Sequence, residues 1–178
     1  MAPMNIFNIQ LVLGYAAWGL CFGAYLWPRL SAMDVAQASR AIAMLHGFRF
    51  FGLVFILPGI VSSGIPAGFA NPAALGDLAT GVLAMLAVAS FRLRPLFWLS
   101  VVAFNVVGAA DLGLAYYHAA SLHLPEVSGQ LGPAYLIPIL YVPILAITHG
   151  AAFVLIGRQL RGVDFPARSS RATQLERS

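Results

Sequence analysis

The segment at residues 134–157, "AYLIPILYVPILAITHGAAFVLIG", decides how this chain folds. It contains no Asp, Glu, Lys or Arg, and a helix needs about 20 mostly apolar residues to cross a bilayer. Hydrocarbon offers no water to backbone N–H and C=O groups, so such a segment is stable there as a helix. We therefore expect a transmembrane helix that is kinked at Pro138 and Pro143, because each proline removes a backbone hydrogen bond.

The composition of the whole chain indicates the same surroundings. Of the 178 residues, 60% are hydrophobic and 9% are charged, whereas soluble domains carry roughly 25% charged residues. A soluble protein with so few charges could not cover its surface with polar groups. The single cysteine, Cys21, cannot form an intrachain disulfide and is not a metal site by itself. The lipid bilayer is therefore the partner that the composition predicts.

Four further segments have the length and hydropathy of spanning helices: residues 6–27, 41–65, 74–91 and 96–117. The first has no basic residue before it and is too long for the hydrophobic region of a secretory signal, so we expect it to remain as a helix. The sequence thus predicts an all-α integral membrane protein, with a bundle of five transmembrane helices in residues 1–161. We also expect a short interfacial helix at 31–40 and a flexible, Arg-rich cytoplasmic tail at 162–178.

The basic residues predict an orientation in the membrane. All ten are arginines, and apart from Arg49 they lie in alternate connections and in the tail. Basic loops face the cytoplasm, so we expect the N-terminus outside and the C-terminus in the cytoplasm. A GC-rich bacterial genome would explain the use of arginine alone, and we expect the chain to lie in the bacterial inner (cytoplasmic) membrane. Because the arginines lie at helix ends rather than on a basic, aromatic-rich face, we expect no nucleic-acid partner.

Small residues recur four positions apart on three of the predicted helices. The pairs are Gly19 and Gly23, Ala109 and Gly113, and Ala146 and Gly150. This spacing lets helix backbones approach closely, either within one bundle or between two copies of the chain. The sequence therefore predicts tight packing or a homodimer through these faces, and it does not choose between them.

Polar side chains inside the apolar segments fall into two groups by depth, at 1.5 Å per residue from the cytoplasmic end of each helix. The inner group comprises Arg49, Asn105, His149 and, one turn nearer the cytoplasm, His46; the outer group comprises Asp77, Asp111 and Tyr141. A charged group at mid-bilayer costs at least roughly 2.5–3.5 kcal/mol on insertion scales, so it faces the bundle interior and finds a partner. We therefore expect these residues to line an intramembrane pocket that binds a small ligand.

Each charged residue has a structural and a functional interpretation. Arg49 either forms an ion pair with Asp111 or Asp77 or binds an anionic ligand. Asp77 is expected at the start of its helix, where a carboxylate also stabilises the helix dipole. Asp111 lies well inside the fourth helix, where a carboxyl group can take up and release a proton. Asp111 and Asp77 are therefore the candidates for proton handling.

The two histidines within helices suggest a specific cofactor. Two histidines from different transmembrane helices can be the axial ligands of a b-type haem iron, and a nearby arginine can neutralise a propionate. His46 and His149 would be those ligands and Arg49 the propionate partner. No local motif specifies this arrangement, and hydrogen-bonded core histidines are the other interpretation.

The loop at residues 118–133 contains His118, His123 and Glu126, three groups that can bind a metal ion at the surface. They can equally be ordinary polar loop residues. As the longest connection, this loop is also long enough to cap the outer face of the bundle.

Three functional hypotheses remain open. The first is ligand or cofactor binding in the pocket, most concretely haem b in membrane electron transfer. The second is a small proton-coupled transporter or permease in which Asp111 carries the proton. The third is a non-catalytic membrane subunit or assembly partner. The sequence contains no CxxC, HExxH or GxSxG motif and no phosphate-binding loop, so it does not indicate an enzyme class.

Overall fold

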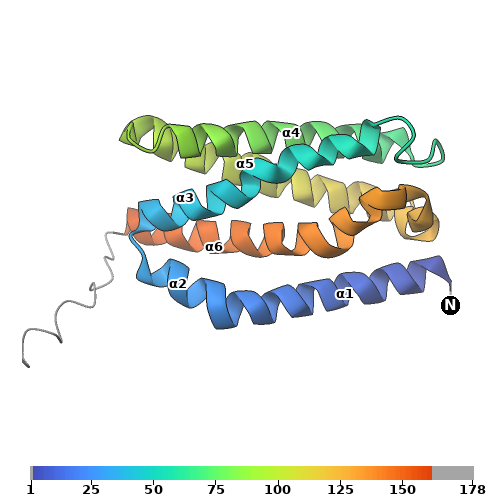
Figure 1. Cartoon of the computed structure of the whole chain (residues 1–178), viewed down its shortest axis with the longest axis horizontal. Helices are drawn as coiled ribbons and strands as arrows, with labels where there is room; N and C mark the ends of the chain where they lie inside the picture. The colour runs from blue at the N-terminus through green and yellow to red at the C-terminus, as the bar shows by residue number, and fades with distance from the viewer. Residues whose placement is uncertain (1, 162–178) are drawn as a thin grey trace, which may run out of the picture.

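The computed structural model describes residues 2–161, and the regular elements of this part are helices (Figure 1). Five stretches of the described chain are long and apolar enough to cross a membrane: Pro3–Ala32, Val35–Ile56, Ala67–Ala89, Arg94–Ser121 and Ile137–Leu160. The prediction of an all-α chain with five such helices is therefore confirmed. The expected tail at 162–178 lies outside the described residues.

Three of the five stretches change helix type along their length. The first comprises α1 (Pro3–Cys21), the π-helical η1 (Phe22–Leu26) and α2 (Trp27–Ala32). The second comprises α3 (Val35–His46) and the 3₁₀ helix η2 (Gly47–Ile56). The fifth comprises the π-helical η4 (Ile137–Tyr141) and α6 (Val142–Leu160). The other elements are α4 (Ala67–Ala89), α5 (Arg94–Ser121) and η3 (Leu124–Tyr135), a 3₁₀ segment that bends at Gly132.

The second helix differs most from its predicted bounds of 41–65. Asp34 accepts hydrogen bonds from the backbone N–H groups of Ala36 and Gln37 at 2.9 and 3.2 Å, which caps a helix that begins at Val35. The expected interfacial helix at 31–40 is therefore wrong, because residues 35–40 are the first turns of α3. The stretch ends at Ile56, before Pro58 and before Gly59, whose φ of 85° is incompatible with a continuing right-handed helix.

The third helix begins seven residues earlier than the predicted residue 74, because α4 starts at Ala67 directly after Pro66. Pro72 does not prevent this: it lies in the second turn of α4, and the helix continues through it without the one backbone hydrogen bond that the proline removes. The consequence concerns Asp77, which lies about three turns inside α4 rather than at its N-terminus. The interpretation of Asp77 as a helix-dipole partner is therefore wrong.

The helices lie side by side along the long axis of the molecule (Figure 1). α4 packs against α5 and η2, and α3 packs against both α4 and α6. α1 contacts α6 and η3 and lies at the edge of the bundle, with Phe7 as its buried residue. Trp18 Nε1 of α1 donates a hydrogen bond to the Leu140 carbonyl at 2.8 Å, which ties this outer helix to the kinked start of the fifth stretch.

The basic connections gather at one end of the bundle, at the left of Figure 1. The guanidinium groups of Arg40 and Arg94 lie 4.6 and 5.0 Å from the centre of the Phe91 ring, so the start of α3 adjoins the turn between α4 and α5. The guanidinium of Arg158 lies 5.2 Å from the Trp27 ring, which joins the end of α6 to α2. Which side of a membrane this end faces remains a prediction.

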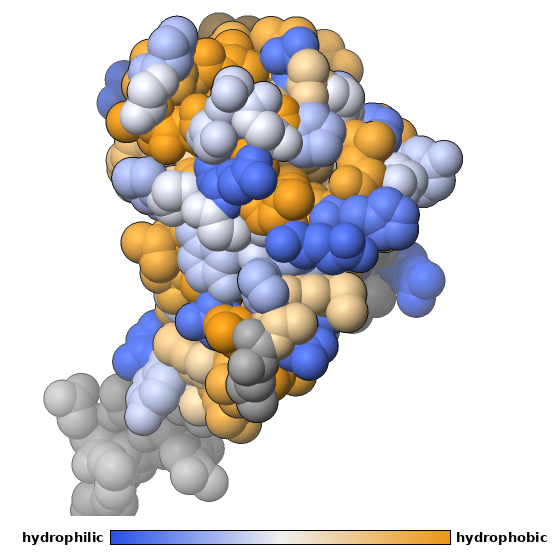
Figure 2. Space-filling view, turned by 90° about the vertical axis from the view of Figure 1, so that its right-hand side faces the viewer, coloured by the Kyte–Doolittle hydropathy of each residue, from blue (hydrophilic) through white to orange (hydrophobic). Residues whose placement is uncertain are grey.

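Two apolar clusters fill the interior, and they are separated along α4 and α5 by polar residues. The first cluster lies toward the arginine end and includes Phe97, Val101, Phe104 and Leu155. The second lies toward the opposite end and includes Phe55, Phe69, Leu124 and Leu131. Leu124 and Leu131 belong to η3, so the long connection after α5 closes this end of the bundle with buried side chains, as expected of a cap. Figure 2 shows the outer surface of that end, where hydrophilic and apolar residues alternate.

The outside of the bundle carries large apolar side chains, among them Leu20, Leu99 and Leu160. A surface of this kind is suited to lipid rather than to water. The predicted small-residue faces also point outward in part: Gly19, Gly23, Gly113 and Gly150 have open space where a Cβ would be. These glycines are therefore not sites of close packing within one chain, and the homodimer stays a prediction.

We expect Leu131→Ala to destabilise the protein strongly, because Leu131 is fully buried in the second cluster and its truncation leaves a cavity. Losses for such changes are about 2–5 kcal/mol. The measurement is the thermal unfolding midpoint of the purified protein in detergent. Leu99→Ala is the matched control, because Leu99 is 67% exposed and should unfold near the wild-type temperature. Equal midpoints for the two variants would contradict the burial of η3.

Candidate functional site

The site is organised around Arg49, whose side chain is fully buried within η2. Its Nε donates a hydrogen bond to Asp77 Oδ1 at 2.6 Å, and its Nη2 donates to Asp111 Oδ2 at 2.5 Å. Nη1 donates to the Gly108 carbonyl at 3.2 Å and lies 3.2 Å from His149 Nε2. A single guanidinium therefore binds groups from α4, α5 and α6, and it joins the two predicted depth groups into one cluster.

His149 continues the network away from the carboxyl groups. Its Nε2 faces a guanidinium, which only donates, so Nε2 accepts and Nδ1 carries the proton. Nδ1 then donates to Asn105 Oδ1 at 3.0 Å, and Asn105 Nδ2 donates to the Val101 carbonyl at 2.8 Å. These bonds hold His149 as a neutral imidazole of one tautomer. Asn105 acts here as the orienting partner of His149.

His46 lies beside this network in contact with it. Its ring centre is 4.1 Å from that of His149, and its Nε2 lies 3.0 Å from Thr148 Oγ1. The Thr148 hydroxyl donates to the Ile144 carbonyl at 2.7 Å, so it accepts from His46 Nε2–H. His46 Nδ1 is then left as a buried acceptor for which the described residues provide no donor.

The arrangement of the two histidines does not fit a haem held between them. Axial imidazoles bind the iron from opposite faces of a flat macrocycle, which must lie between the two rings. The rings of His46 and His149 are in direct contact at 4.1 Å, tilted by 50°, and His149 uses both ring nitrogens for other bonds. A haem would require both rings to move apart and His149 to give up its contact with Arg49.

Glycines create the space that the cluster occupies. A Cβ on Gly108 would lie 2.6 Å from His149 Nε2 and 2.7 Å from Arg49 Nη1, closer than any real side chain allows. A Cβ on Gly52 would collide with the Asp77 carboxyl group. Residues without side chains are therefore required where η2, α4 and α5 meet around the guanidinium.

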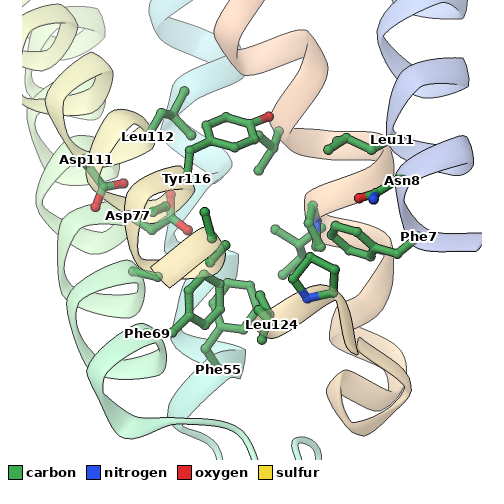
Figure 3. Close-up of a pocket in the computed structure, with 18 residues that line it drawn as sticks. Phe7, Asn8, Leu11, Phe55, Phe69, Asp77, Asp111, Leu112, Tyr116 and Leu124 are labelled. Carbon is green, nitrogen blue, oxygen red and sulfur yellow. The ribbon is translucent and has the colours of Figure 1, made fainter. Parts of the chain in front are cut away.

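A cavity of about 210 Å³ opens beside the carboxyl groups (Figure 3). Asp77 and Asp111 form one side of it, and their side chains are 13% and 10% exposed. The rest of the lining is mainly apolar and comes from α1, η2, α4, α5, η3 and the fifth stretch. Aromatic rings are prominent in it, namely Phe7, Phe55, Phe69 and Tyr116. The cavity therefore has a polar side with carboxyl groups and an apolar, aromatic remainder.

The cluster carries more acid than base. Arg49 supplies one positive charge, whereas Asp77 and Asp111 supply two carboxyl groups, and His149 is neutral. If both carboxyl groups are ionised, one negative charge has no partner in a low-dielectric surrounding, which is costly. The site is therefore suited to hold one further positive charge, either a proton or a cationic group of a ligand.

Most of the predicted site residues meet in this one region. Arg49, Asp77, Asp111, His149, Asn105 and His46 are linked as described above. Tyr141 is nearby but separate, because its hydroxyl donates to the Leu45 carbonyl at 3.1 Å. In the loop after α5, His123 Nδ1 lies 3.4 Å from Glu126 Oε1, and both side chains are mostly exposed. The described residues contain no group of three His, Cys, Asp or Glu side chains placed to hold a metal ion.

Two kinds of residue at the site are not predicted by the sequence. Thr148 was overlooked because a threonine next to a histidine gives no separate signal in an apolar helix. The aromatic lining gives no signal because phenylalanine occurs in every predicted segment, and only the packing of α1 against the other helices places Phe7 opposite Phe55 and Phe69.

Comparison with known families provides one match. A family described as "Domain of unknown function (DUF8737)" matches residues 6–157. The chain belongs to this family. The matched range includes the whole Arg49 cluster and every residue that lines the cavity, so the site lies within the family's domain. Searches among curated proteins and among solved structures give no match.

We expect Gly108→Ala to disrupt the cluster, because its Cβ would collide with Arg49 Nη1, His149 Nε2 and Thr80 Cγ2. The thermal unfolding midpoint in detergent should fall by several degrees. Gly113→Ala on the same helix is the matched control, since its Cβ meets open space and alanine favours a helix over glycine by about 1 kcal/mol. A Gly108→Ala protein as stable as the control would show that Arg49 does not pack against α5 at this point.

Proposed function

We propose that this protein is a small multi-pass carrier of the bacterial inner membrane. It binds a ligand in the apolar cavity and couples that binding to the uptake of a proton by Asp111 and Asp77. The single observation that carries the proposal is that one guanidinium, Arg49, is bonded to two carboxyl groups at the side of an otherwise apolar cavity. Such a site is one positive charge short, and a proton is the smallest occupant that supplies it.

The helix types around the site support a carrier that changes shape. 3₁₀ runs longer than three or four residues are uncommon, yet η2, which bears Arg49, is a 3₁₀ helix of 10 residues. η4 is a π-helical turn with Pro138 at its start, and Pro138 lines the cavity. Interrupted helices that border a binding site are typical of secondary transporters, where they allow parts of the bundle to rock.

The predicted orientation supports access to the cavity from the outer side of the membrane. With the arginine end in the cytoplasm, the N-terminus and the capping segment η3 face outward, and the cavity lies in the outer half of the bundle. A ligand would then reach Asp77 and Asp111 from the outer side. Arg49 and the histidines lie between these carboxyl groups and the cytoplasm.

The other two hypotheses account for less of the site. The positions of His46 and His149 on different helices favour electron transfer through haem b. Their direct ring contact does not, because it leaves no space for a haem between them. A non-catalytic subunit would explain buried ion pairs as packing, but it leaves the unbalanced carboxyl group and the adjoining cavity without a role. Proton-coupled ligand binding uses both features.

We expect one carboxyl group of the cluster to bind a proton in the absence of a ligand, because Arg49 neutralises only one of the two. Infrared difference spectroscopy of the protein in lipid should show a protonated carboxyl C=O band that grows with acidity and is lost or shifted in Asp111→Asn. Glu126→Gln is the control, because the Glu126 side chain is exposed and pairs with His123 rather than with the cluster. A wild-type protein with no titrating band of this kind, or a band unchanged in both Asp111→Asn and Asp77→Asn, would contradict the proposal.

We further expect charge balance, rather than Arg49 itself, to determine stability. Arg49→Met leaves two carboxyl groups without their cation and should cost about 3–5 kcal/mol. Combining it with Asp77→Asn and Asp111→Asn removes the repulsion and should restore most of the lost unfolding midpoint. The triple variant should nevertheless lack the titrating carboxyl band. A triple variant as unstable as Arg49→Met alone would argue against the charge-balance explanation.

A further inference from the structure

We infer that the ligand is a small organic cation with an aromatic or apolar body, and that it competes with the proton for Asp77 and Asp111. This inference rests on the proposed function and deepens it by naming the class of ligand. The features that carry it are the charge of the polar side of the cavity, the aromatic rings on its other sides, and its volume.

The charge on the polar side of the cavity determines whether a cationic or an anionic ligand is favoured. Arg49 reaches each carboxyl group through one oxygen only, Asp77 Oδ1 and Asp111 Oδ2. The second oxygen of each group has no hydrogen-bond donor among the described residues, and both side chains border the cavity. The guanidinium itself is fully buried behind them and presents no surface to the cavity. A ligand therefore meets carboxyl oxygens and not the cation, which favours an ammonium over a carboxylate or phosphate.

The aromatic rings favour a cation for a second reason. Figure 3 shows Phe55 and Phe69 on one side of the cavity, Phe7 across from the carboxyl groups and Tyr116 on a third side. Phe55 and Phe69 form an edge-to-face pair with ring centres 5.5 Å apart. The faces of aromatic rings attract cations, and rings that surround a site bind ammonium groups in this way. A cation here would be held between ring faces and carboxyl oxygens.

The volume limits the size of the ligand. An apolar cavity of 150 Å³ holds one benzene molecule, so the cavity of about 210 Å³ accepts a single ring with a short side chain. Such a ligand can place its ring among Phe7, Phe55 and Phe69 and its ammonium group against Asp111. Larger ligands would require α1 to move away from the bundle.

Proton and ligand compete because each supplies the same missing charge. The titratable and charged groups around the carboxyl pair are Arg49 from η2, Asp77 from α4, Asp111 and Tyr116 from α5, Tyr141 from η4 and His149 from α6. Asp77, Asp111 and Tyr116 line the cavity, and the Tyr116 hydroxyl is hydrogen-bonded to that of Tyr15 from α1, which leaves the two carboxyl groups to bind a cation. Binding of a cation should therefore displace a proton, and the apparent affinity should fall as the pH is lowered. In a membrane, this exclusion is the basis of proton–cation exchange.

The test compares three probes of similar size with the purified protein in zwitterionic lipid nanodiscs: benzylammonium, benzyl alcohol and benzoate. Isothermal titration calorimetry should show saturable binding of benzylammonium, about tenfold or more tighter than benzyl alcohol, and no binding of benzoate. Asp111→Asn should remove the preference for the cation. Phe69→Leu keeps an apolar lining without a ring face and should weaken benzylammonium by about two- to thirtyfold. Glu126→Gln should bind as the wild type does.

The outcomes separate this inference from the proposed function. If benzylammonium and benzyl alcohol bind equally, or benzoate binds best, the cation assignment is wrong, even where the infrared band shows proton uptake at Asp111. If benzylammonium binds selectively but releases no proton in buffers of different ionisation enthalpy, the competition is wrong. If Asp111→Asn does not fold, Phe69→Leu decides: unchanged binding of benzylammonium in that variant would overturn the aromatic site.

Discussion

The structure depends on the burial of one guanidinium. Arg49 lies in the interior of a bundle whose outer surface is apolar, and a cation in such a place is stable only when it is paired and hydrogen-bonded. Asp77 and Asp111 supply the charge from α4 and α5, and the Gly108 carbonyl and His149 Nε2 accept hydrogen bonds from Nη1. The contacts of η2 with α4 and of α4 with α5 follow from this requirement, since the helices must approach closely enough for one side chain to reach all its partners.

The same constraint explains why the site has an open side. A guanidinium has donors for two carboxyl groups, but it neutralises only one of them. Arg49 is therefore hydrogen-bonded to both carboxyl groups, but one negative charge at the side of the cavity has no cation to balance it. Two apolar clusters enclose it from both ends, so water has little access except through the cavity. The same three side chains thus join the helices and form the polar side of the cavity.

Hydropathy alone predicted the number and approximate position of the helices, because the length of an apolar run is a local property of the chain. It also predicted which polar residues face inward. It failed for the start of α3, where the capping by Asp34 extends a helix into a polar segment, and for Asp77, whose helix begins earlier than its apolar core. The predicted depths put Arg49 and the two aspartates in different groups because they were counted along the backbone. The long side chain of Arg49 bridges this distance and reaches both carboxyl groups. The contact between His46 and His149 depends on helix rotation, which one sequence does not specify.

The 3₁₀ geometry of η2 has a mechanical consequence. Ten residues extend about 20 Å as a 3₁₀ helix and about 15 Å as an α-helix. A change of η2 from one form to the other would shorten the second stretch by about 5 Å, close to one α-helical turn. Because Arg49 is the third residue of η2 and Phe55 is the ninth, such a change would alter the distance between the charged side of the cavity and one of its aromatic walls. Over the six residues from Arg49 to Phe55 the change amounts to about 3 Å, so the helix type of η2 sets the length of the cavity between these two residues.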